Sequence, residues 1–117
     1  MEKVTIWHNP RCSKSRNSLT LLEEKGIEAE VVKYLDDLPS REALTQMLAM
    51  LGMKSFRELM RTKEAVYTEL NLANENSEEV LLTAMVENPK LIERPIVIKG
   101  NRAVIGRPIE NVVELLG

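Results

Sequence analysis

Apolar residues in the first part of the chain predict a strand, a helix and a second strand. A short apolar run at 4–7 precedes a polar loop, and a helix-like stretch at 14–25 then ends at Gly26, a residue typical of helix C-termini. The β-branched and aromatic residues at 31–34 favour a second strand. Because a helix of this length connects the two strands, we expect them to pair in parallel as a βαβ unit.

The middle of the chain has the periodicity of helices. Apolar residues between 44 and 51 follow the i, i+3, i+4, i+7 spacing of one helical stripe, and Ser40 is the expected N-cap of that helix. Residues 55–58 fit the capping box S-x-x-E, so a short helix is expected to begin there. Further helical segments are predicted at 64–70 and 78–87.

The last part of the chain predicts a hairpin and a closing helix. A strand at 95–98 is followed by Gly100 and Asn101, a common hairpin loop, and the chain is expected to return antiparallel through 103–105. Pro108 suits the first turn of the final helix, whose predicted apolar stripe comprises Ile109, Val112, Val113 and Leu116. The full order predicts an α/β fold: a mixed four-stranded sheet with flanking helices and a helical insert between a βαβ half and a ββα half.

Length and composition predict one soluble domain over residues 1–117. The net charge of −2 gives no basic footprint for nucleic acid, and no apolar run approaches the ~20 residues of a membrane span. The N-terminal residues lack the features of a signal peptide, so we expect a cytoplasmic protein, and we expect it to be a monomer. One cysteine and one histidine are too few ligands for a structural zinc site, and no bound cofactor is expected.

The candidate chemistry centres on Cys12, the only cysteine of the chain. It lies between the first strand and the first helix, where unpaired backbone N–H groups and the helix dipole favour an anion. Arg11, Lys14 and Arg16 add positive charge nearby. These effects stabilise a thiolate, the reactive form, so Cys12 is a candidate nucleophile. A lone intracellular cysteine is more often a small buried hydrophobic residue, but the polar surroundings here favour the nucleophile.

Three short motifs carry a resemblance to a known family. They are His8-Asn9-Pro10-Arg11-Cys12 with Ser15-Arg16, then Glu93-Arg94-Pro95-Ile96-Val97-Ile98, then Gly106-Arg107-Pro108. Together they resemble the glutaredoxin-coupled arsenate reductase family, which has a thioredoxin-like fold, and the resemblance covers essentially the whole chain. It implies that Cys12 is the nucleophile. It also implies that a small oxyanion substrate is held by three arginines, Arg61, Arg94 and Arg107, and that Pro95 is a cis-proline beside the thiol.

The implied activity is reduction of arsenate to arsenite, with glutathione as the reductant and glutaredoxin as the partner that restores the thiol. Arsenate is a tetrahedral oxyanion, and the planar fork of arginine suits such groups. Because the chain has no second cysteine, an outside thiol must complete the redox cycle. Ser15 lies three residues after Cys12, so its hydroxyl is expected to turn toward the sulfur, and His8 is a candidate to tune the thiol.

Several alternatives remain open at this level. Arg57 lies one helical turn before Arg61 and competes with it as the third arginine, and each arginine has a surface role as its alternative. Ser15 also fits a helix-start residue, and His8 a structural one. The loop after Cys12 lacks the Gly and Thr of the best-known arsenate-reducing members. The alternative functions are therefore a glutathione-dependent thiol reductase with another substrate, or a non-catalytic partner-binding module of the same fold.

Overall fold

The computed structural model describes residues 3–117, which group into two compact units. The sheet unit comprises the chain up to Asp37 together with Arg94–Gly117, and the helical unit is the intervening segment Leu38–Glu93. The predicted helical insert is thus confirmed, and it separates the βαβ half from the ββα half. That residues 1–117 form one domain stays a prediction.

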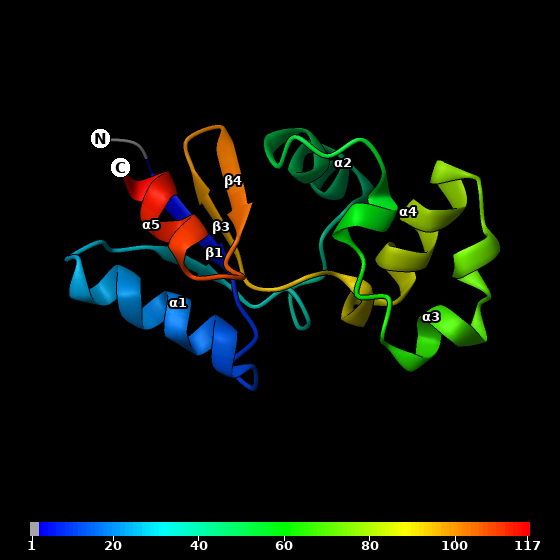
Figure 1. The fold of residues 1–117 in the computed structure, drawn as a ribbon, viewed down its shortest axis with the longest axis horizontal. Helices are drawn as coiled ribbons and strands as arrows, with labels where there is room; N and C mark the ends of the chain where they lie inside the picture. The colour runs from blue at the N-terminus through cyan, green and yellow to red at the C-terminus, as the bar shows by residue number, and fades with distance from the viewer. Residues whose placement is uncertain (1–2) are drawn as a thin grey trace. The chain divides into compact units, whose positions relative to one another are not determined.

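The sheet unit is built on a mixed four-stranded sheet in the order β2-β1-β3-β4 (Figure 1). Its strands are β1 (Val4–Trp7), β2 (Glu30–Val32), β3 (Ile96–Lys99) and β4 (Arg102–Ile105). Strand β1 pairs with β2 in parallel and with β3 antiparallel, and β3 pairs with β4 antiparallel. The predicted βαβ unit and the hairpin at Gly100 and Asn101 are both confirmed. Gly100 has a φ of 62°, which glycine adopts without strain.

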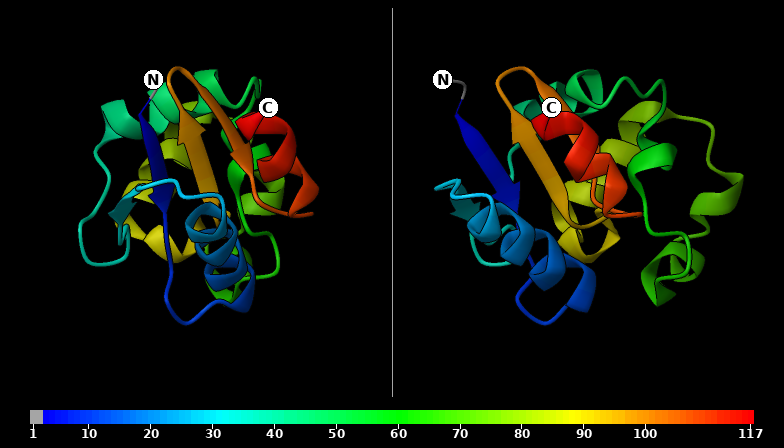
Figure 2. Two further views of the ribbon diagram at one scale, coloured as in Figure 1. Left: turned by 90° about the vertical axis from the view of Figure 1, so that its left-hand side faces the viewer. Right: turned by 60° about the vertical axis from the view of Figure 1, so that its left-hand side comes forward.

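Helices α1 (Ser13–Glu24) and α5 (Glu110–Leu116) pack on one face of the sheet (Figure 2). Alternate side chains of β1 and β3 point to this face because the side chains of a strand alternate between two faces. They meet one stripe from each helix and form a core of Val4, Ile6, Leu22, Val97, Val112 and Leu115. Burial of this apolar surface fixes the beginnings of α1 and α5 at the same end of the sheet.

Two predictions in the sheet unit need correction. The second strand ends at Val32 rather than at 34, because the backbone N–H groups of Asp36 and Asp37 bind the carbonyl of Lys33 and turn the chain there. Tyr34 is instead fully buried, and its ring stacks on that of Trp7 with centroids 6.3 Å apart. This turn leaves β2 as a strand of three residues.

The stripe predicted for the last helix is also displaced. Pro108 precedes the helix rather than lying in its first turn, and α5 begins at Glu110. The buried positions are Val112 and Leu115, while Val113 is 43% exposed. The buried face thus consists of positions three apart, which share one side of a helix, and it leaves out Val113.

The helical unit contains three α-helices and three short 3₁₀ turns. They are α2 (Arg41–Met50), η1 (Phe56–Leu59), α3 (Ala65–Glu69), η2 (Leu72–Asn74), α4 (Glu78–Glu87) and η3 (Pro89–Leu91). Ser40 caps α2 as predicted, and its hydroxyl accepts from the N–H of Ala43. The capping box at Ser55 is present, although the turn that it opens is a 3₁₀ turn and not an α-helix.

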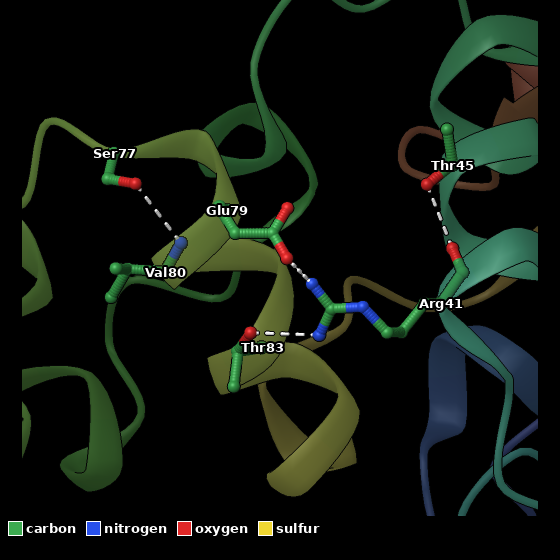
Figure 3. Close-up of polar contacts among 6 residues, drawn as sticks. All are labelled: Arg41, Thr45, Ser77, Glu79, Val80 and Thr83. Carbon is green, nitrogen blue, oxygen red and sulfur yellow. Dashed lines mark hydrogen bonds and ion pairs between the residues drawn. The ribbon is translucent and has the colours of Figure 1, made fainter.

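One arginine fastens α2 to α4 within the helical unit (Figure 3). The guanidinium of Arg41 donates to the hydroxyl of Thr83 at 2.8 Å and pairs with the carboxylate of Glu79.

An isolated antiparallel bridge, Met60 with Ile92, ties the end of η1 to the segment after η3. This bridge sets the position of Arg61, which follows it directly.

Candidate functional site

Cys12 is the N-cap residue of α1, as the loop-to-helix pattern predicts. Its backbone N–H donates to the carbonyl of Asn9 at 3.0 Å, and its carbonyl accepts the first helical bond from the N–H of Arg16. The thiol makes no capping hydrogen bond, and the residue is only 9% exposed. The sulfur therefore lies at the positive end of a helix of 12 residues and does not serve as the helix cap.

The loop that carries Cys12 is fixed by Ser15 and His8. The Oγ of Ser15 accepts from the backbone N–H of Asn9 at 3.0 Å and lies 2.6 Å from Nδ1 of His8. Both side chains are buried. If the hydroxyl of Ser15 donates its hydrogen bond to Nδ1, then Nδ1 is the acceptor nitrogen of the ring. A neutral His8 then carries its ring proton on Nε2. These contacts of Ser15 hold the loop together, and the expectation that its hydroxyl turns toward the sulfur stays a prediction.

The surroundings of His8 favour its neutral form. Burial lowers the pKa of its imidazole below the ordinary value of 6.5, and the positive charges of Lys33 and Arg16 lower the pKa further. A neutral ring can accept the hydroxyl proton of Ser15, whereas a protonated ring cannot. The state of His8 and the geometry of the thiol loop are thus coupled.

A second loop brings Arg107 to the thiol. Nη2 of Arg107 lies 3.6 Å from Sγ of Cys12, and Nε of the same guanidinium donates to the carbonyl of Arg94 at 2.8 Å. Among residues 3–117, the buried Nε of Arg94 has no hydrogen-bond partner. Arg107 therefore joins the backbone of Arg94 to the thiol of Cys12, and the buried Nε of Arg94 is a donor left for a ligand.

Pro95 and Gly106 join these loops. The Arg94–Pro95 peptide bond is cis, as the family resemblance implies, and the carbonyl of Pro95 accepts from the N–H of Gly106 at 2.9 Å. A Cβ on residue 106 would stand 2.6 Å from Oγ of Ser18 and 2.8 Å from Cγ of Pro95. Only glycine lets the backbone before Arg107 approach α1 and Pro95 this closely. The motif contains Gly106, but its packing role depends on contacts distant in sequence.

Arg61 and Arg57 belong to the helical unit and have different partners. Arg61 pairs with Glu64 through Nη1 at 3.0 Å and with Glu93 through Nε at 3.5 Å. Arg57 donates to the backbone carbonyls of Leu72 and Glu75 and to the hydroxyl of Tyr67. The contacts of Arg57 are those of a structural arginine, and the choice of Arg61 as the third ligand-binding arginine stays a prediction.

The sheet unit thus brings together six of the seven residues singled out from sequence. They are His8, Cys12, Ser15, Arg94, Pro95 and Arg107. Asn9 was missed: its carbonyl receives the N–H of Cys12 and its side-chain oxygen receives the N–H of Arg11. The Asn-Pro pair is a turn signal that could have indicated this role. The arrangement can hold a thiolate and a small anion side by side.

Neither a cluster of metal ligands nor a membrane-spanning helix is found in the part of the chain that the structure describes. Within residues 3–117, no cluster of three or more His, Cys, Asp or Glu side chains is placed to bind a metal ion. In the same range, no helix has the length and apolar character needed to cross a membrane.

Comparison with known proteins assigns the chain to a family. The model of the ArsC family matches residues 7–115. The uncharacterized protein YfgD of Escherichia coli strain K12 is 56% identical over 99% of this chain and 98% of its own length. The arsenate reductase of Neisseria meningitidis serogroup A is 50% identical over 99% of this chain and all of its own length.

A solved structure extends the likeness to the fold. The arsenate reductase from Vibrio cholerae superposes with a TM-score of 0.93 at 50% sequence identity, covering 97% of each chain. This agreement confirms the thioredoxin-like α/β fold that the motifs imply. With the family model matching nearly the whole length and two relatives at half identity or above, the chain belongs to the ArsC family.

Proposed function

We propose that the protein reduces arsenate to arsenite, with Cys12 as the nucleophile, glutathione as the reductant and glutaredoxin as the partner that restores the thiol. The observation that carries the proposal is the contact of Arg107 with the sulfur, together with the Nε, unpaired within residues 3–117, of Arg94, whose carbonyl Arg107 binds. Arg107 reaches Sγ at 3.6 Å, and the buried Nε of the adjoining Arg94 lacks a partner among the described residues. A buried donor without an acceptor is costly unless a ligand satisfies it.

A tetrahedral oxyanion fits these donors. Arginine presents several N–H groups in a plane, keeps its charge at all relevant pH values and binds such oxygens in a bidentate manner. The helix end at Cys12 adds positive potential at the same place. That Arg61 supplies a third guanidinium stays a prediction of the family resemblance, because its Nη1 and Nε pair with Glu64 and Glu93 within the helical unit.

The reaction then proceeds in three steps. The Cys12 thiolate attacks arsenic, an S–As bond forms, and one arsenate oxygen leaves as water after protonation. A glutathione thiolate attacks Sγ, an S–S bond forms, and the electron pair of the S–As bond stays on arsenic, which falls from As(V) to As(III). A second thiol, from glutaredoxin, attacks the glutathione sulfur of the mixed disulfide and releases the Cys12 thiolate.

The site residues have distinct roles in this scheme. Cys12 is the catalytic nucleophile, and Arg94 and Arg107 hold the oxyanion. His8 and Ser15 hold the loop in which the sulfur is presented, and Pro95 keeps Arg94 next to the loop of Arg107. The cytoplasm is the compartment proposed for this reaction because its glutathione pool is reduced.

A coupled assay tests the proposal. Purified protein is incubated with arsenate, glutathione, glutaredoxin and a recycling system, and arsenite formation is followed; the Cys12→Ser variant is the matched control. We expect turnover that requires all the components and disappears in the variant. Absence of arsenate-dependent turnover, together with reduction of a glutathione mixed disulfide, would instead assign a thiol reductase.

A further inference from the structure

A hollow opens beside the thiol loop, between the beginnings of α1 and α5. Its volume is about 480 Å³, within the range of small-molecule sites. Lys14 and Asn17 line it from α1, Arg107 from the loop that reaches the sulfur, and Ile109 and Glu110 from the start of α5. The hollow lies wholly in the sheet unit.

Arg107 connects this hollow to the reacting sulfur. It lines the hollow and also places Nη2 at 3.6 Å from Sγ of Cys12. Lys14, a second lining residue, follows Cys12 by two positions in the first turn of α1. A molecule seated in the hollow would therefore contact a side chain that also contacts the thiol.

The charges that line the hollow are two cations and one anion. Lys14 and Arg107 suit carboxylates, Glu110 suits an ammonium group, and Asn17 can both donate and accept. Glutathione carries the matching set, because it has two carboxylates, one ammonium group and one thiol. Mixed charge of this kind does not match a simple inorganic anion, for which Glu110 would be repulsive.

We propose that this hollow is the seat of glutathione, with Lys14 and Glu110 as its specificity-determining residues. The inference rests on the proposed function, since it places the reductant of that reaction. Glutathione seated there would direct its thiolate at Sγ of Cys12. The step is the one already balanced: the S–S bond forms, the S–As bond breaks, and its electron pair reduces arsenic.

The first test uses no arsenate, so its outcome is independent of the proposed reaction. Cys12 in the free-thiol protein is exposed to glutathione disulfide, and the rate of adduct formation is followed by intact mass. A neutral disulfide, 2-hydroxyethyl disulfide, is run in parallel. The variants are Lys14→Glu and Glu110→Lys, and the matched controls are Lys25→Glu at the far end of α1 and Glu114→Lys one turn along α5.

We expect the rate with glutathione disulfide, divided by the rate with the neutral disulfide, to be about three- to tenfold lower in both variants than in the parent. This ratio cancels any effect of a variant on the reactivity of Cys12 itself. The two variants change the charge in opposite directions, so a loss in both is specific for a ligand that carries both charges. A general attraction of an anionic ligand would slow Lys14→Glu and speed Glu110→Lys, whereas a seat for a zwitterion is damaged by both.

The second test is the KM for glutathione in arsenate reduction, which should rise by a similar factor in both variants while the KM for arsenate changes less. Opposite effects of the two reversals on the glutathione disulfide rate, or equal effects on the charged and the neutral disulfide, would overturn the hollow as the seat. Failure of arsenate reduction with the disulfide selectivity intact would overturn only the proposed reaction.

Discussion

Arginines are used differently in the two units of this molecule. In the helical unit, the guanidinium of Arg57 is occupied by two backbone carbonyls and a tyrosine hydroxyl, and that of Arg61 pairs with two carboxylates. In the sheet unit, Arg107 donates to one carbonyl and to the thiol, and Nε of Arg94 is buried without a partner among the described residues. The difference lies in how many acceptors the fold supplies to each side chain.

This contrast separates structural from ligand-binding arginines. A guanidinium whose donors are satisfied by the fold contributes to stability, and its removal leaves carbonyls unpaired. One whose donors are left over near a thiol raises the local positive potential without completing a network. Sequence shows the same residue type in both places, so only the partners distinguish the two roles.

The largest expected effect separates the two kinds of arginine. Arg57→Ala should lower the free energy of unfolding by about 2–3 kcal/mol, because it removes several charge-assisted hydrogen bonds at a partly buried site. Arg107→Ala should change it by less than about 1 kcal/mol, because its bond to Arg94 is exposed. Urea unfolding measures both.

The activities of the same variants should show the reverse order. Arg107→Ala is expected to reduce kcat/KM for arsenate by roughly ten- to a hundredfold, the loss of one charged hydrogen bond to the substrate. Arg57→Ala, assayed well below its unfolding midpoint, should retain most of the parent activity. Equal losses of stability and activity in the two variants would abolish the contrast.

A smaller effect is expected at Gly106, which lets the loop of Arg107 lie against α1. Gly106→Ala should lower the free energy of unfolding by about 1–3 kcal/mol, because the new methyl group overlaps Ser18 and the rigid ring of Pro95. Thermal and urea unfolding measure the change. Gly26→Ala is the control, because a Cβ at residue 26 meets nothing within 4 Å. Any loss of stability in that variant comes from its positive φ of 71° and not from a steric overlap. A Gly106→Ala protein as stable as the parent would show that the close approach is not needed.

The smallest effect is the pH dependence due to His8. Its pKa is lowered in the folded protein, so the unfolded chain binds more protons as the pH falls below about 6.5. Stability from this group is therefore fully present above that pH, and it is lost as the pH falls toward the folded pKa. Unfolding measured between pH 7.5 and 5 should show this decline, and His8→Asn should flatten it. If the free energy of unfolding of His8→Asn falls with pH as steeply as that of the parent, groups other than His8 cause the decline.

Local patterns predicted most of the elements because their causes are local. The strand Val4–Trp7 and the helix Glu78–Glu87 have the predicted bounds, and the caps at Ser40 and Ser55 form as expected. The end of β2 was misplaced because the turn around Lys33 depends on backbone hydrogen bonds rather than on β-forming side chains. Residues with high strand propensity do not extend a strand when the chain turns.

The site was harder to derive because its contacts join distant residues. Cys12 could be singled out from its neighbours, but the direction of the Ser15 hydroxyl is set by His8 and Asn9. The structural role of Arg57 rests on the carbonyls of Leu72 and Glu75, and the need for Gly106 rests on Ser18 and Pro95. No spacing along the chain encodes these partners.

The central claim is that Arg94 and Arg107 form an oxyanion site beside Cys12. Calorimetric titration with sulfate, a tetrahedral oxyanion that the thiol does not reduce, tests it most directly. Lysine keeps the charge but not the planar fork, so Arg94→Lys and Arg107→Lys should each bind sulfate roughly ten- to a hundredfold more weakly than the parent. Arg57→Lys, in the helical unit, should bind as the parent does. If Arg94→Lys and Arg107→Lys bind sulfate with the affinity of the parent, the oxyanion site is not where these two arginines lie.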